Sequence, residues 1–483
     1  MFSKEGKVIN PLEKVGNEIK GYLKAPLLKR VLEEIGNLLE DRREYYLVGG
    51  AIRDIVLKRA PFDFDLAVAG KGIELASHFA QRIRGKFVLL SEKEDEARVV
   101  KKGIDGKIFT FDFKGLVGGE IVTDLKDRDF TINAIAFGPL NDLEKARVLD
   151  PFAGLSDIRK KIIRLVTEDA LRKDPLRILR AVRFALELNF RIDKNLWSFG
   201  REISLAGIAR ERIAYEVLRI LGAKNTYSYI QKLLLLGLLP QIFPSFVFFF
   251  QDQETFRHSL LTYKKLESIL SDEKDEIGRF FRQFPEWQDY IKSPNILPIL
   301  KLAALFHDLA KPLTRREEEG EVHFYGHDAL GAKLIFDSLK KELRLSNDIS
   351  ERVKRLTLYH MRLHLLATRS EEITERAMRR FLRDLGEDAL GLMALTCADG
   401  YATARKTKHL EIAIERIINF KREEDKKKNI KRLVTGYDLI DLGLKPGPIF
   451  KKILGEIEEM TLEGKIKTKE EGLEYVRKNY LPV

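Results

Sequence analysis

Residues 45–65 read YYLVGGAIRDIVLKRAPFDFD, and this stretch decides the fold of the chain. It begins with an apolar run of strand type, Tyr45–Val48, which stops at Gly49 and Gly50. Backbone N–H groups can come close to a ligand there because no Cβ is in the way. Arg53 follows within one helical turn and can neutralise a polyphosphate. The stretch therefore predicts a phosphate-binding turn after a strand.

Two acidic residues, Asp63 and Asp65, open the next apolar run, Leu66–Ala69. In a strand, the side-chain period of two places both carboxylates on one face and Phe64 on the other. Carboxylates that share a face repel each other unless a cation lies between them, and oxygen ligands beside a phosphate site suit Mg²⁺. A double glycine or a D-x-D pair alone is usually structural, but the two together predict a metal-dependent nucleotide site.

The composition narrows the class of protein. A chain of 483 residues has room for about two to four domains. The 86 Lys and Arg exceed the 74 Asp and Glu, giving a net charge of +12, which favours a polyanionic partner, although a hyperthermophile surface is also rich in Lys and Glu. The single cysteine, Cys397, excludes an intramolecular disulfide. Since no apolar stretch reaches membrane-spanning length and no signal peptide is recognisable, we expect a cytoplasmic protein without membrane partners.

Further elements flank the two motifs. Residues 11–40 read as helical and Ile73–Ile83 as an amphipathic helix. Three strands are expected after that helix, at Phe87–Leu90, Ala97–Val100 and Ile108–Phe113. The last of these strands carries Asp112 in the middle of an apolar alternation. A lone acid on a strand face is more often exposed than catalytic.

The order of GG, RD and D-x-D resembles the nucleotidyltransferases of the DNA polymerase β superfamily, and the wording LVGGxxRD is similar to the class II branch of tRNA CCA-adding enzymes and bacterial poly(A) polymerases. This resemblance implies an α+β fold: an N-terminal polymerase-β-like sheet with helices, then an all-α neck, an HD-type helical body and a helical tail. It also implies that Asp63 and Asp65 bind Mg²⁺ and that Asp112 completes the set of three catalytic carboxylates.

Residues 124–137, DLKDRDFTINAIAF, form the next motif. A capped helix start would explain much of this pattern. The stretch also resembles the family's RRDFTxNA motif, which contacts the ribose and phosphates of the incoming nucleotide, and this implies that role for Arg128, Asp129 and Asn133. Asp127 departs from the family by standing where it has its first arginine.

Residues 171–188, LRKDPLRILRAVRFALEL, place Arg177, Arg180 and Arg183 on one stripe of a helix. From the pattern alone the stripe is either a solvated surface or a functional one. The resemblance implies that Asp174 and Arg177 match the EDxxR base-recognition motif, while the other two arginines hold the triphosphate. An acceptor beside a forked donor can pair with the Watson–Crick edge of a base. Lys173 departs from the family, which has glutamate there, and residues 209–221 resemble a fifth motif that braces this helix.

The histidines gather later in the chain, in the order H…HD…H…H…D, carried by His258, His307, Asp308, His327, His360 and Asp399. Structural histidines could cluster by chance. The order resembles the HD-domain metal phosphohydrolases, which bind one or two divalent ions that activate water, and it implies a second metal site for Ni, Mn, Co or Mg. Its substrate would be a 2′,3′-cyclic phosphate, a 2′-phosphate or another phosphoester, or the site is structural. His323, His364 and His409 are less regular and lie outside the set.

These patterns predict a division into four parts: a nucleotidyltransferase head at 1–150, a helical neck at 151–250, an HD-type helical domain at 251–420 and a tail at 421–483. The tail begins with a charged run, KREEDKKKNIKR, which is either a linker or a helix face, and continues through the turn GLKPGP into a helix. We expect it to contact the tRNA elbow by shape and phosphate.

The resemblance predicts a template-independent tRNA nucleotidyltransferase that binds the acceptor and TΨC arm and the 3′ end of tRNA. Only 15 residues, Phe113 to Asp127, separate Asp112 from Arg128. In the family this short form is typical of enzymes that add only CC, which implies CTP as substrate and a separate A-adding enzyme. The alternatives are a full CCA-adding enzyme that also uses ATP, a poly(A) polymerase and, in a different class, an HD-type phosphohydrolase whose first half senses nucleotides.

Overall fold

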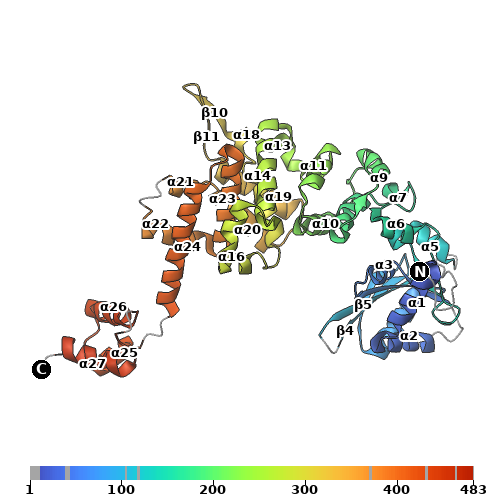
Figure 1. Cartoon of the computed structure of the whole chain (residues 1–483), viewed down its shortest axis with the longest axis horizontal. Helices are drawn as coiled ribbons and strands as arrows, with labels where there is room; N and C mark the ends of the chain where they lie inside the picture. The colour runs from blue at the N-terminus through green and yellow to red at the C-terminus, as the bar shows by residue number, and fades with distance from the viewer. Residues whose placement is uncertain are drawn as a thin grey trace. The chain divides into compact units, whose positions relative to one another are not determined.

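A computed structural model describes residues 11–38, 44–103, 106–116, 120–368, 373–429, 433–462 and 465–481. The fold is α+β, as predicted, with a sheet near the N-terminus followed by helices (Figure 1). The chain forms two compact units, Met1–Val247 with Ser338–Ser346, and Phe248–Asp337 with Asn347–Val483. Within the described residues, no helix is both long and apolar enough to cross a membrane.

The first unit contains a seven-stranded sheet in the order β3-β4-β5-β2-β1-β6-β7. Its strands are β1 (Tyr45–Val48), β2 (Asp63–Val68), β3 (Lys86–Ser91), β4 (Glu96–Lys102), β5 (Ile108–Gly115), β6 (Ala136–Gly138) and β7 (Arg147–Leu149). The five strands expected from the sequence are confirmed. Strands β2 and β5 pair in parallel with Asp65 beside Asp112, so both side chains lie on the same face.

The opposite face of this sheet is packed with aromatic rings. Phe64 is buried and stacks on Phe111 with 5.5 Å between ring centroids. Phe79 of α4 (Gly72–Ile83) meets Phe111 edge-on at 5.6 Å. Burial of such rings is the main favourable term in holding helix on sheet. The predicted division between a carboxylate face and an apolar face is therefore confirmed.

The helical segments around the sheet also follow the prediction. Residues 11–38 form two helices, α1 (Pro11–Leu23) and α2 (Pro26–Leu38), while positions 39 and 40 of the predicted helix lie outside the described residues. Helix α5 (Ile121–Asp127) and η2 (Thr131–Asn133) lie between β5 and β6, and β7 is followed by α6 (Gly154–Lys160), α7 (Ala170–Lys173), α8 (Arg177–Leu188) and α10 (Arg210–Gly222). Helix α8 packs on α10, so the expected contact of residues 209–221 with this helix is confirmed, while their role at a base site stays a prediction.

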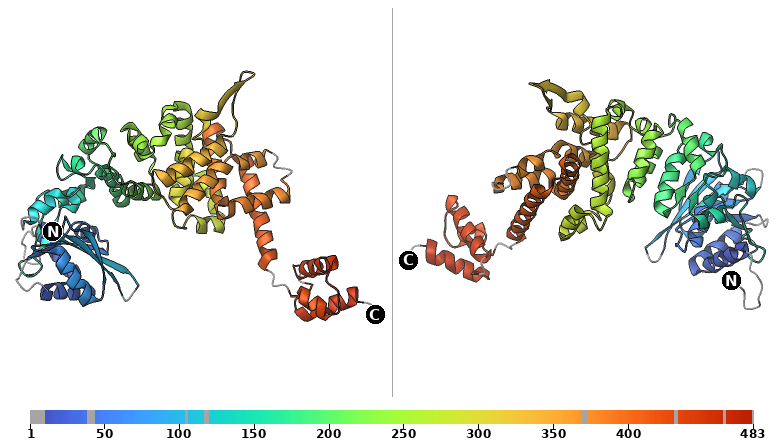
Figure 2. Two further views of the ribbon diagram at one scale, coloured as in Figure 1. Left: turned by 180° about the vertical axis from the view of Figure 1, so that it is seen from behind. Right: turned by 45° about the horizontal axis from the view of Figure 1, so that its top comes forward.

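The second unit is a bundle whose central helices are α14 (Gln253–Ser271), α17 (Ile296–Phe306), α20 (Asn347–Tyr359) and α23 (Ala389–Ala404) (Figure 2). Helix α17 is buried along its whole length. Its one charged residue, Lys301, pairs with Glu267 at 2.6 Å, which satisfies both buried groups. The bundle thus gives rigid positions to residues at helix ends.

The last helices form a small core of their own. Helices α25 (Gly436–Asp441), α26 (Pro448–Leu462) and α27 (Lys469–Tyr480) enclose Val434, Leu439, Ile453, Ile457, Ile466 and Val476. The predicted turn and following helix are confirmed. Helix α24 (Lys408–Asn429) continues through residue 420, so the described part of the charged run is a helix face and the expected boundary at 420 lies inside a helix. The four-part division stays a prediction.

Candidate active site

The turn after β1 brings backbone and side chains into close approach. Gly49 has φ 76° and ψ −137°, a conformation that only glycine adopts readily, and it precedes α3 (Gly50–Val56). A Cβ at Gly49 would overlap Nη1 of Arg128 and lie 2.7 Å from Oδ2 of Asp65. Glycine is therefore required where the phosphate-type turn, the D-x-D strand and the RD motif meet.

The carboxylates of β2 suit a cation. Asp63 is exposed and Asp65 is half-buried on the same face. Burial raises the pKa of Asp65, and the charges of Asp112 and Asp63 add to the rise, while Arg128 at 3.5 Å lowers it. Asp63 accepts a hydrogen bond from the Thr110 hydroxyl. A divalent ion between Asp63 and Asp65 would stabilise the charged carboxylates, so the residues fit the Mg²⁺ that the sequence predicts.

Asp112 lies beside Asp65, but its carboxylate is already engaged. Arg98 of β4 donates from Nε and Nη2 to the two Asp112 oxygens, at 2.7 Å each. Among the described residues, three or more potential ligand atoms lie within 4.8 Å of one another only in the histidine cluster, so the three aspartates do not close around one point. The sequence analysis missed Arg98, which faces Asp112 across the β4–β5 pair and was visible only as a cation in an alternating strand.

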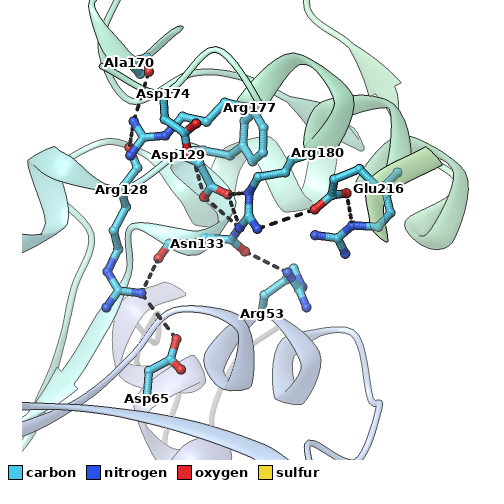
Figure 3. A network of polar contacts seen from close by, with 12 residues as sticks. Arg53, Asp65, Arg128, Asp129, Asn133, Ala170, Asp174, Arg177, Arg180 and Glu216 are labelled. Atoms are coloured by element: carbon cyan, nitrogen blue, oxygen red, sulfur yellow. Dashed lines mark hydrogen bonds and ion pairs between the residues drawn. The ribbon is translucent and has the colours of Figure 1, made fainter. Parts of the chain in front are cut away.

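One polar network joins three of the predicted motifs (Figure 3). Arg53, held by Asp54, donates from Nη1 to Oδ1 of Asn133 at 2.7 Å. The Asn133 amide donates to Asp129 at 3.0 Å, and Arg180 donates to the other Asp129 oxygen at 2.6 Å. Burial disfavours the charged Asp129, but Arg180 and Asn133 hold its pKa below the ordinary value. The network fixes the orientation of two guanidinium groups.

The predicted base-recognising arginine is held by backbone carbonyls. Arg177 donates from Nη2 to the Asp127 carbonyl oxygen at 2.7 Å, and from Nη1 to the carbonyl oxygens of Arg128 and Ala170 at 3.3 Å each. A guanidinium with three fixed acceptors has little freedom to reorient. Its unused donor edge is therefore fixed in one position.

Its partner Asp174 is also held. Arg212 of α10 donates to Oδ2 of Asp174 at 2.7 Å. The two residues that depart from the family pattern meet each other nearby, since Lys173 Nζ lies 2.6 Å from Asp127 Oδ1. Arg212 was missed by the sequence analysis, although it belongs to the segment 209–221 that we expected to brace α8.

A buried ion pair anchors the last arginine of the stripe. Arg183 donates from Nε to Glu216 at 2.6 Å, and Glu216 is 2% exposed. Arg183 also pairs with Glu187 at 3.1 Å, and Arg180 lies 3.8 Å from Glu216. Glu216 was missed as well, and its signal in the sequence is its place four residues after Arg212, on the same face of α10.

Two cavities meet at these residues. One of about 430 Å³ includes Asp112, Asp174, Arg177 and Arg212 in its lining. The other, of about 500 Å³, is lined on one side by Gly50, Arg53, Asp63, Arg183 and Arg219. Both include Asp65, Arg128, Asp129 and Arg180. A nucleotide could place its polyphosphate in the arginine-rich cavity and its base in the other cavity. Its reacting phosphate would then lie beside Asp65, which lines both cavities.

The six residues predicted for the HD-type site converge in the second unit. Asp308 is 1% exposed, and neither of its oxygens has a well-directed hydrogen bond, although Lys311 Nζ lies 2.7 Å from Oδ2. His307 and His258 face Oδ2 at 3.2 and 3.5 Å. His360 and His327 face Oδ1 at 3.5 and 3.6 Å. Asp308 thus lies between two pairs of histidines.

The tautomers of these histidines favour metal binding. The Nδ1 atoms of His307, His327 and His360 each lie 2.7 to 3.1 Å from a backbone carbonyl oxygen, which can only accept a hydrogen bond. Their Nε2 lone pairs then face the Asp308 carboxylate, an arrangement that is repulsive unless cations lie between. Two triads share Asp308, His258–His307–Asp308 and Asp308–His327–His360, so the donor set fits two divalent ions bridged by one carboxylate.

Asp399 lies next to the first triad, with Oδ1 2.8 Å from His258 Nε2. Its other oxygen lies 3.0 Å from Nε2 of His364, which the sequence analysis left outside the set. His364 was not predicted as part of the site because it follows His360 by only four residues. It lies on the next helix, α21 (Arg362–Ala367). His323 and His409 form no part of this cluster.

Families of known proteins match successive parts of the chain. The family described as "Poly A polymerase head domain" matches residues 45–164, "Probable RNA and SrmB- binding site of polymerase A" matches 189–249, and "HD domain" matches 255–404. The first two contain much of the lining of the two cavities but not the lining residues between 174 and 188, and the third covers the histidine cluster.

Curated relatives match over most of the chain. A CC-adding tRNA nucleotidyltransferase of Thermus thermophilus is 30% identical over 444 residues, covering 89% of this chain and 92% of that protein. An A-adding tRNA nucleotidyltransferase of Deinococcus radiodurans is 28% identical, covering 89% and 94%. A CC-adding tRNA nucleotidyltransferase of Geobacter sulfurreducens is 38% identical over 200 residues, 41% of this chain and 45% of that protein. The solved Thermotoga maritima CCA-adding enzyme complexed with tRNA-CCA has the same fold, with TM-score 0.61, 21% identity and coverage of 97% and 98%.

The two adjacent glycines are expected to respond oppositely to alanine. Gly49→Ala should destabilise the β1–α3 region by about 1–3 kcal/mol, because an L-residue is strained at this φ and ψ and its Cβ would displace Arg128. Gly50→Ala, with its nearest neighbour at 3.4 Å in a helical position, should be neutral or stabilising by up to about 1 kcal/mol. Hydrogen exchange of β1–α3 peptides in urea measures both, and equal losses would contradict this account.

The Arg183–Glu216 pair gives a second matched test. Glu216→Ala should cost about 3 kcal/mol in the α8–α10 region, because it leaves the buried Arg183 guanidinium with Glu187 alone as its acidic partner. Glu216→Gln keeps an acceptor oxygen and should cost clearly less. Urea unfolding with exchange measured on α8 and α10 peptides checks the order, and a Gln variant as unstable as the Ala variant would refute the anchoring role.

Proposed function

Because this chain belongs to the family of the tRNA nucleotidyltransferases, we propose that it adds CMP residues from CTP to the 3′ end of tRNA without a template and releases pyrophosphate. The observation that carries the proposal is the junction of the two cavities at Asp65, Arg128, Asp129 and Arg180. It provides adjacent places for a polyphosphate and for a base, with a metal-type carboxylate pair between them.

In the proposed reaction, the tRNA 3′-oxygen bonds to the α-phosphorus of CTP and the bond to the pyrophosphate oxygen breaks. Arg53, Arg180 and Arg183 would bind the triphosphate in the arginine-rich cavity, in orientations set by Asn133, Asp129 and Glu216. Asp63 and Asp65 would hold Mg²⁺, which when bound lowers the barrier to attack by the 3′-hydroxyl and neutralises charge on the triphosphate.

Asp112 would act beside this pair rather than alone. Arg98 holds the Asp112 carboxylate in place. Burial is the main cause of the raised pKa of the neighbouring Asp65, and the negative charge of Asp112 adds to it. A carboxylate in that position favours a bound cation and can orient the attacking hydroxyl. Arg98 is then the residue that keeps Asp112 in place.

Selection of cytosine would fall to Asp174 and Arg177. Three carbonyl oxygens fix Arg177, and Arg212 fixes Asp174, so the two groups present one donor and acceptor pattern. A site that used CTP and then ATP would have to change this pattern. The locked pair therefore supports one base over two.

The segment before Arg128 supports the same product. Strand β5 ends at Gly115 and α5 begins at Ile121, so five residues lie between the two elements. We infer from this short spacing, which is the short form identified in the sequence, that the product ends in CC. A separate A-adding enzyme would then complete the tRNA end.

We also propose a second activity, metal-dependent hydrolysis of a phosphoester by the histidine cluster. The observation that favours it is Asp308, whose buried carboxylate lies between two histidine pairs without well-directed hydrogen bonds. His258, His307, Asp308, His327 and His360 would hold the divalent metal, which when bound would supply activation of water and neutralise charge on the phosphoryl group. The substrate would be a 2′,3′-cyclic phosphate, a 2′-phosphate or a related ester.

The main proposal is tested on tRNA that ends at the discriminator base. With Mg²⁺ and both CTP and ATP, we expect 3′ ends that stop at CC, and no addition with ATP alone. Sequencing of the 3′ ends measures this. Asp65→Ala should abolish addition and leave tRNA affinity within about threefold, since the change removes a metal ligand and not an RNA contact. Ends that read CCA would refute the single-base site, and runs of A on unrelated RNA would indicate a poly(A) polymerase.

The histidine cluster is tested by metal counting on the full chain with Mn²⁺ or Ni²⁺, by mass spectrometry after dialysis. We expect Asp308→Ala to lose two ions per chain relative to the unmodified protein, because both triads share it, and His360→Ala to lose one. Asp63→Ala is the matched control, which should keep both ions of this cluster. Unchanged metal content in Asp308→Ala, with an unchanged melting temperature, would refute the two-ion centre.

A further inference from the structure

A groove of about 910 Å³ opens on the second unit, between α15 (Glu276–Arg282), the segment 405–407 and the start of α24. Four of its lining side chains are basic, against two glutamates, Glu276 and Glu411; the basic ones are Arg279, Arg405, Lys406 and Lys408. Every lining residue belongs to the second unit, so the groove is distinct from the cavities at Asp65.

The groove keeps a net positive charge, because its four basic side chains face only two glutamates. In the described part of the chain, Arg279, Arg405 and Lys406 have no ion pair with an acidic residue. Lys408 is neutralised by Glu411 at 2.9 Å, and the Thr407 hydroxyl donates to the same carboxylate at 3.1 Å. Like charges that line one hollow repel each other, and a bound polyanion would relieve that repulsion.

The rest of α24 shows that this lack of partners is local. Lys421 pairs with Asp425 at 3.1 Å, Lys426 with Glu423 at 2.7 Å, and Arg422 with Glu286 at 2.7 Å. Each of these three cations has an acidic neighbour, whereas Arg279 of α15 and the pair Arg405 and Lys406, which precede α24, have no ion pair among the described residues. The groove therefore gathers unpaired cations beside the start of α24.

An aromatic side chain forms part of the groove wall. Phe280 is half-buried and is held by Phe281 and Phe284, with ring centroids 5.5 and 5.2 Å away. Cations beside a fixed ring form the combination that binds RNA, since phosphates meet the cations and an unpaired base or ribose can pack on the ring.

We propose that this groove binds the phosphate backbone of the tRNA substrate. Arg279, Arg405 and Lys406 are the phosphate contacts, and Phe280 is a packing surface for an exposed base or ribose. The identification of the RNA as tRNA rests on the proposed function, whereas the groove itself carries the requirement for a polyanion. Contacts of this type set affinity and position without reading sequence.

The test compares two double charge reversals in the full chain. Arg405→Glu/Lys406→Glu changes the groove, and Lys292→Glu/Arg380→Glu changes the same charge at two exposed sites elsewhere in the second unit. Affinity for tRNA lacking its CCA end is measured by fluorescence anisotropy over a range of KCl concentrations. The groove variant should bind about ten- to a hundredfold more weakly, and the slope of log affinity against log salt should fall by roughly 2, about 0.9 per lost phosphate contact. The control should stay within about threefold.

Arg279→Gln on α15 gives a second reading that adds no negative charge, and it should weaken binding about three- to tenfold at an unchanged melting temperature. The groove is refuted if its variants keep the affinity and the salt slope, or if the control weakens binding equally, which would show an effect of net charge alone. Displacement of tRNA by millimolar inorganic phosphate at constant ionic strength would also overturn the proposal in favour of a small-anion site. This assay measures tRNA binding and not nucleotide transfer. A protein that binds tRNA through the groove but does not extend it would therefore refute the proposed function and leave the groove proposal standing.

Discussion

The Asp129 carboxylate is the contact on which the first unit depends. It is buried, and its two oxygens accept hydrogen bonds from Asn133 and from Arg180. Each of these partners in turn contacts a further charged residue. Asn133 holds Arg53 of the glycine turn, while Arg180 and Arg183 share Glu216 of α10. Donors and acceptors alternate along the whole chain of contacts, so several arginines can lie close together without a bound anion. A site for a triphosphate needs that arrangement, because the cations must be in place before the ligand arrives.

Much of this could be predicted from the sequence because the features are local. The strands follow from alternation, as with Phe64 between Asp63 and Asp65, and the turn follows from a glycine pair. The six members of the histidine cluster were found from their order along the chain, although their convergence on Asp308 is a product of helix packing. Residues that act through a distant partner were not predictable. Arg98, Arg212 and Glu216 have ordinary sequence contexts, and only the pairing of β4 with β5 and of α8 with α10 gives them neighbours.

The ion pair between Asp127 and Lys173 was likewise not predictable from the sequence. Along the sequence, each residue is a separate departure from a motif, and the two lie 46 positions apart. In space they form one ion pair at 2.6 Å with both side chains about half exposed. Such a pair contributes only about 0–1 kcal/mol to stability. Its effect is therefore positional: it ties the end of α5 to the residue before Asp174, close to the carbonyl oxygens that hold Arg177.

The short connection between β5 and α5 has a consequence for how such a protein can change. The proposed base-selecting groups, Arg177 and Asp174, are held by carbonyl oxygens and by Arg212. Substituting a single side chain would therefore not add a mobile segment to the base site. Under the proposed activity, a shift from a two-nucleotide product to a three-nucleotide product would need added chain length between Gly115 and Ile121. Lengthening a flexible loop costs little free energy in general, about 0.6 kcal/mol for each doubling of length, so loop-closure entropy would not oppose such a change. Under this proposal, the nucleotides that are added depend on the number of residues between two motifs more than on the identity of any one residue.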